Sequence, residues 1–240
     1  MARMISWPDG VQPNGVEPLS GPRTIGSAQT QSMSGFLQTV AAPFGLLRLR
    51  FGFPPLRREP FRRYRGWITA LHGGANATRV PLCDWDGMSI ADLGVNKTAA
   101  EWKAGESWSD GNPWSNGTNW KNGPPDVGVA VASAVGDTDI TLAGSYWGHA
   151  LDIGDRIGFN PFSLGAYTIT QVFGSGHYRI WPSLRTALGS SSVATLRPVL
   201  AMRLESEEAA NAPRGASFAE GLNVTLVEVL DYDARAYFAD

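Results

Sequence analysis

The stretch LLRLRFGFPP at residues 46–55 determines how this chain begins to fold. Its apolar and charged residues alternate, so that Leu49 and Phe51 lie on one face of an extended backbone and the two arginines lie on the other. A period of two is typical of a strand with one buried face. The two prolines end the strand, because proline has no N–H group to donate to a sheet. The stretch therefore predicts a half-buried strand over residues 46–53.

A helix is predicted directly after this strand. Apolar residues recur at spacings of three and four between residues 58 and 71, and Pro60 suits the first turn of a helix. Gly73 and Gly74 end the pattern. Residues 77–82 then predict another strand, so this part of the chain forms a strand–helix–strand unit.

The pattern is uniformly β from Asp126 to about Leu204. Glycine-rich turns separate short strands, which are predicted at 128–133, 138–142, 155–159, 166–173, 177–182 and 193–197. Strands of this length and spacing are typical of a small barrel or sandwich. A last strand is predicted at 222–230, and it is followed by a polar tail.

Residues 1–35 are rich in Gly, Pro, Ser, Gln and Asn, and they predict an extended N-terminal arm. Two outcomes stay open for this arm. It is a disordered terminus, or it docks through its few apolar residues, among them Trp7 and Val11.

Charge is distributed unevenly along the 240 residues. Residues 1–82 hold ten arginines and three acids, a net +7, whereas residues 205–240 hold two bases and eight acids, a net −6. The whole chain carries −2, which argues against a nucleic-acid-binding protein. Oppositely charged ends are compatible with head-to-tail self-assembly and equally with pairing inside one molecule. The candidate residues for such a contact are Arg57, Arg58, Arg62, Arg63 and Arg65, with Glu205, Glu207 and Glu208. The alternative for the arginines is a solvated helix face.

Residues 102–125 contain four copies of Trp-x-x-Gly-x-x, with the tryptophans at Trp102, Trp108, Trp114 and Trp120. Asp or Asn before Gly in this repeat is typical of tight turns with the glycine at positive φ. Three interpretations stay open. The indoles stack on one another or on the body of the protein, they form a platform for sugar rings or another ligand, or they anchor a subunit contact.

The sequence contains no catalytic or nucleotide-binding fingerprint. Asp84 and Asp86 are spaced as a carboxylate pair, but this spacing next to a glycine is typical of a turn. Cys83 is interpreted as a small core residue, and the three histidines lie far apart in the sequence. No stretch of about 18 apolar residues predicts a membrane span, and the N-terminus lacks the apolar core of a signal peptide. We expect a structural or binding protein, not an enzyme, with no metal and no cofactor.

Two segments resemble the tail proteins of long-tailed bacteriophages. The first is LRLRFGFPPLRRE at residues 47–59, followed by an aromatic helix, LHGG and TRVPL. The second comprises LDIGDRIG at 151–158, YTIT at 167–170, HYRIWPSLR at 177–185 and VATLRP at 193–198. Together the segments cover residues 45–82 and 126–204, about half of the chain. The arm and the Trp repeat lie outside the resemblance.

The resemblance implies a distal tail protein of siphophage type, a ring component of the tail tip. It implies a mainly β fold in which a β-sandwich ring domain with one helix, formed by residues 36–100 and 205–240, carries residues 126–204 as an inserted small β-barrel or sandwich. Such rings are commonly sixfold and contact the tail tube protein, the tail hub and receptor-binding or fibre proteins, while DNA passes through the lumen without specific binding. The location would be the virion tail tip, after synthesis in the host cytoplasm. The alternatives are a tail-tip hub or adaptor, or a carbohydrate- or cell-wall-binding module that uses the Trp repeat.

Overall fold

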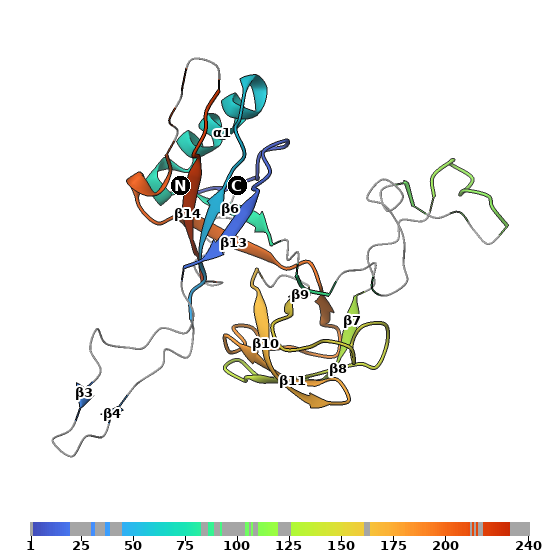
Figure 1. The fold of residues 1–240 in the computed structure, drawn as a ribbon. Coiled ribbons are helices and arrows are strands. Elements are labelled where there is room, and N and C mark those ends of the chain that lie inside the picture. Colours follow the sequence, from blue (N-terminus) through green and yellow to red (C-terminus); the bar gives the residue numbers. More distant parts are fainter. Residues whose placement is uncertain are drawn as a thin grey trace.

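A computed structural model describes residues 2–19, 30–31, 37–38, 45–82, 86–88, 92, 104–105, 107, 110–119, 126–160, 164–211, 213, 215 and 218–230. Within these residues the fold is mainly β, as expected: one six-stranded sheet, one closed six-stranded barrel, a two-stranded hairpin and one α-helix (Figure 1). The hairpin consists of β3 (Thr30–Gln31) and β4 (Leu37–Gln38).

The first sheet has the strand order β1-β6-β13-β14-β5-β2. Its strands are β1 (Met4–Ile5), β2 (Gly15–Pro18), β5 (Arg48–Gly52), β6 (Ala77–Pro81), β13 (Val199–Leu204) and β14 (Asn223–Glu228). All neighbours pair antiparallel except β1 and β6, which are parallel. The strands predicted at 46–53, 77–82 and 222–230 are confirmed as β5, β6 and β14.

Helix α1 (Arg58–Ala70) confirms the predicted helix and covers one face of this sheet. Its buried residues are Phe61, Tyr64 and Trp67. The Trp67 indole donates a hydrogen bond to Oγ1 of Thr78 on β6 (3.3 Å), and the Tyr64 hydroxyl donates to the carbonyl of Asn211 (2.7 Å). We expected a β-sandwich for this domain. In the part of the chain that is described, the layer that packs on the sheet is helix α1.

The second sheet closes into a barrel with the order β10-β11-β8-β7-β12-β9. Its strands are β7 (Val127–Val131), β8 (Asp139–Leu142), β9 (Arg156–Asn160), β10 (Tyr167–Gly174), β11 (His177–Trp181) and β12 (Val193–Thr195), so all six predicted strands are confirmed. The barrel has its own core, in which Trp147, Ile157 and Leu184 are fully buried.

The end of the inserted domain differs from the expected position. Residues 199–204 are predicted to belong to the second β-domain, but they form β13, which pairs with β6 and β14 of the first sheet. The insertion therefore ends near Pro198. Sequence could not show this, because one partner of β13 is β6, which lies more than a hundred positions earlier in the chain.

Residues 2–19 of the predicted arm are extended and dock on their own chain. β1 and β2 are the two edge strands of the first sheet, and Val11 is fully buried. The Trp7 indole donates to the carbonyl of Val11 (2.6 Å), and its ring centre lies 4.7 Å from that of Trp67. This segment belongs to the first domain, because it completes the layer between α1 and the sheet.

A buried ion pair joins the barrel to the first sheet. Arg185 of the barrel forms a two-pronged contact with Glu228 of β14, and its Nη2 lies 2.9 Å from Oε2 of Glu228. The two side chains are 6% and 0% exposed. Glu228 also accepts a hydrogen bond from the backbone N–H of Leu47 (3.0 Å), and Arg185 donates to the carbonyl of Gly45 (2.7 Å). A Cβ at Gly45 would lie 2.0 Å from the Trp181 ring, so glycine permits this approach.

We expect Arg185→Met to lower the free energy of unfolding by about 3–5 kcal/mol, because it leaves the Glu228 carboxylate buried without its partner. Arg179→Met is the matched control. Arg179 is also a barrel arginine paired with an acid, but the Arg179–Asp139 pair is 46% and 43% exposed, so its loss should cost less than about 1 kcal/mol. If Arg185→Met and Arg179→Met lower the free energy of urea-induced unfolding equally, the Arg185–Glu228 pair has no special stabilising role.

Candidate functional site

The five arginines predicted as a contact surface are all exposed, on α1 or just before it. Two of them are engaged within the chain. Arg63 pairs with Glu59 (Nη2 to Oε1, 2.6 Å) and donates from Nη1 to the carbonyl of Asp9 (2.8 Å). The guanidinium of Arg57 lies 5.2 Å from the centre of the Phe218 ring, within cation–π range.

The other three form what we call the basic helix face: Arg58, Arg62 and Arg65. In the part of the chain that is described, their exposed side chains have no hydrogen bond or ion pair. Arg58 also lies at the positive end of the helix dipole, where a cation is unfavourable by about 0.3–1 kcal/mol. The charge of Arg58 therefore does not stabilise the helix.

The three predicted acids do not lie together. Glu207 and Glu208 are exposed on a short 3-10 helix, η3 (Glu207–Ala209), and we call this pair the acidic end. η3 packs against η1 (His72–Gly74), which follows the last turn of α1. The basic helix face thus lies in the first two turns of α1, and the acidic end lies beyond its last turn. The rise to the end of the helix is about 18 Å from Arg58 and about 8 Å from Arg65.

Glu205 lies elsewhere, on the face of the first sheet opposite α1, which we call the open face. It pairs with Arg48 of β5 (Oε2 to Nη2, 2.5 Å). The Arg48–Glu205 pair joins the basic N-terminal part of the chain to its acidic C-terminal part within one molecule. Glu205 is therefore removed from the proposed contact between subunits, and Glu207 and Glu208 remain as its acidic residues.

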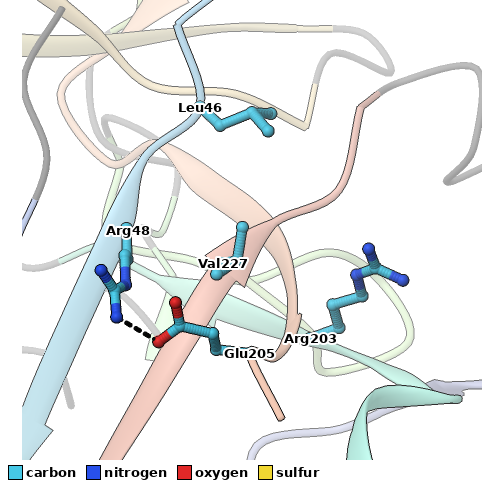
Figure 2. A pocket seen from close by; sticks show the side chains of 5 residues that line it. All are labelled: Leu46, Arg48, Arg203, Glu205 and Val227. Carbon is cyan, nitrogen blue, oxygen red and sulfur yellow. Dashed lines mark hydrogen bonds and ion pairs between the residues drawn. The ribbon is translucent and has the colours of Figure 1, made fainter. Parts of the chain in front are cut away.

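A cavity of about 240 Å³ opens beside this pair on the open face (Figure 2). Its lining residues come from three neighbouring strands and the segment before β5: Leu46, Arg48, Arg203, Glu205 and Val227. Sequence analysis missed this site. Alternation in β5 predicts that Arg48 points away from the core, but it cannot show that β13, far along the chain, places Arg203 nearby.

The Trp repeat adopts the predicted turn chemistry wherever it is described. Gly105, Gly111 and Gly117, spaced by six residues, have φ of +77°, +83° and +77°. Two of these turns are closed by a side chain: Asp110 Oδ1 accepts from the N–H of Asn112, and Asn116 Oδ1 accepts from the N–H of Thr118, both at 3.0 Å. The backbone hydrogen bond to Asp110 lowers the pKa of its carboxyl.

Trp114 is 42% exposed, and residues 110–118 around it are all exposed. This exposure disfavours stacking of Trp114 on the protein body and leaves open stacking of the indoles on one another, a ligand platform and a subunit contact. Trp102, Trp108 and Trp120 lie outside the described residues, as do Cys83 and Asp84.

Among the described residues, no cluster of three or more His, Cys, Asp or Glu side chains could hold a metal ion. In the same residues, none of the helices has the length and apolar character needed to cross a bilayer.

Comparison with known proteins identifies no relative of this chain. The chain matches no protein-family model, and a search of curated proteins finds no match.

The exposure of Trp114 has a measurable consequence for stability. We expect Trp114→Ala to change the free energy of unfolding by less than about 1 kcal/mol, as is usual for surface substitutions. Trp147→Ala, at a fully buried tryptophan of the barrel core, should cost about 3–5 kcal/mol. A loss at Trp114 as large as that at Trp147 would show that this indole holds the fold together.

Proposed function

We propose that this protein is a structural subunit of a bacteriophage tail, a ring component at the distal end of the tail tube. In this role it joins the tube to the tail tip and carries receptor-binding or fibre proteins on the outside. DNA passes through the lumen without specific binding. The protein carries out no catalysis and uses no cofactor.

The domain layout is the observation that carries the proposal. The first sheet is completed by β13 and β14, which follow the barrel in the sequence, and by β5 and β6, which precede it. A β-domain interrupted by a smaller β-domain is the arrangement that the tail-protein resemblance implies. Helix α1 comes between β5 and β6, where the PPLRR-type motif leads to a helix in those proteins.

The charge distribution supports head-to-tail assembly. The basic helix face lies toward the start of α1 and the acidic end lies beyond its last turn. Among the described residues, no ion pair joins the two patches within one copy. The basic face of one copy can instead contact the acidic end of the next. Such a heterologous contact gives a closed ring when the rotation between neighbours closes. The unfavourable interaction of Arg58 with the helix dipole would be offset when an acidic partner covers it.

We expect the purified chain to form a closed ring in 0.1 M salt, with a mass that is a multiple of 25.8 kDa by light scattering. Arg62→Glu with Arg65→Glu should reduce this mass to that of the monomer, because like charges then face each other. Glu207→Arg with Glu208→Arg should do the same. Salt at 1 M should weaken assembly of the native chain, since it shortens the screening length from about 10 Å to about 3 Å.

Mixing the two reversed variants is the decisive step. Every contact between one variant and the other again joins opposite charges, so the mixture should recover the ring although neither variant forms it alone. Arg197→Glu, a reversal at an exposed barrel arginine, is the control and should leave the mass unchanged. A native chain that is monomeric at every salt and protein concentration, or reversed variants that assemble normally, would overturn this interface.

The exposure of Trp114 favours a second candidate, a cell-wall-binding tail module. Its loop places an indole beside several amide and hydroxyl side chains, which together suit stacking on a sugar ring and hydrogen bonding to its hydroxyls. This candidate predicts retention of the protein on purified bacterial cell walls, and at least a tenfold loss of retention in Trp114→Ala. Retention that is absent, or unchanged by Trp114→Ala, would eliminate it.

A further inference from the structure

We propose that the cavity on the open face binds an acidic side chain, Asp or Glu, carried by a polypeptide segment of another protein chain. The strand register builds the cavity. Arg203 of β13 lies opposite Val227 of β14, and Val227 lies opposite Arg48 of β5. Two guanidinium groups therefore flank one apolar residue across three adjacent strands, about 10 Å apart at the backbone.

The charges lining this cavity are not balanced. Glu205 is the one acid among the lining residues, and it is paired with Arg48. Arg203 is exposed, and its side chain has no hydrogen bond or ion pair within the described residues. Nε of Arg48 is buried and likewise lacks a hydrogen-bond partner among them. Arg203 thus provides the accessible unused donors of the cavity wall, whose net charge of +1 fits one further carboxylate.

The size and the apolar residues of the cavity specify the ligand further. Pockets for small organic ligands usually measure about 300–1,000 Å³, and this cavity of about 240 Å³ is smaller. Leu46 and Val227 provide apolar contact for a short methylene chain, while Arg203 and Arg48 provide donors for a carboxylate. Asp and Glu combine these two features.

This inference does not depend on ring formation, because the cavity is built by residues of one chain and lies apart from the basic helix face. Methyl NMR of the full chain tests it, whether the chain is a monomer or a ring. The probes are the methyl groups of Leu46 and Val227 in the cavity, with Val131 of the barrel as a distant reference. The ligand is the peptide acetyl-Ala-Glu-Ala-amide, with acetyl-Ala-Gln-Ala-amide as its neutral counterpart.

We expect the Glu peptide to shift the Leu46 and Val227 signals in a saturable way, and the Gln peptide to bind at least tenfold more weakly. Arg203→Gln should weaken binding of the Glu peptide at least tenfold, because it removes a charge-assisted hydrogen bond. Arg50→Gln is the matched control. Arg50 lies on the same face and loses the same charge, but it is paired with Glu17 and does not line the cavity, so affinity should change less than twofold.

Three results would overturn the inference. The first is the absence of saturable shifts at Leu46 and Val227. The second is an equal loss of affinity in Arg203→Gln and Arg50→Gln, which would indicate attraction to the whole face. The third is displacement of the peptide by inorganic phosphate at equal concentration, which would indicate a site for free anions instead of side chains.

Discussion

The buried pair between Arg185 and Glu228 is the interaction on which the arrangement of the two domains depends. Burying two charges is costly, and the cost is offset only where both groups keep good hydrogen bonds. Here the carboxylate also accepts from Leu47 N–H and the guanidinium also donates to the Gly45 carbonyl. These contacts join the barrel, β14 and the segment before β5 at one point. The pair therefore fixes the inserted domain against the strands that flank it in sequence.

The two proposed contact surfaces lie on opposite faces of the first sheet. The basic helix face and the acidic end lie on the α1 side of the first sheet, and the cavity lies on the open face. One copy thus presents charged surfaces on two sides of a single sheet, as a subunit in contact with more than one neighbour requires. Both surfaces consist of side chains whose charges are incompletely balanced within the described chain, and such surfaces are suited to association with other chains.

The sequence predicts the local elements well and the long-range partners poorly. Alternation at residues 46–53 and the three- and four-residue spacing after Arg58 are local signals, and both elements form. The turn chemistry of the Trp repeat is local too, since it depends on Gly at positive φ. In contrast, β13 carries no sign that it belongs to the first sheet. The placement of Arg203 near Arg48 follows from that pairing, and the placement of Arg185 beside Glu228 follows from the packing of the barrel against β14. The cavity and the junction therefore could not be predicted.

The distance between the two domains tests this account most directly. Spin labels at Thr69→Cys on α1 and Ser145→Cys on the barrel report this distance by pulsed electron paramagnetic resonance. Cys83→Ser removes the native cysteine, and dilution with unlabelled chains removes distances between copies. Both labelled positions are exposed. One narrow distance distribution is predicted, and it should broaden in Arg185→Met. A broad distribution with Arg185 and Glu228 intact would contradict a barrel fixed to the sheet by this pair.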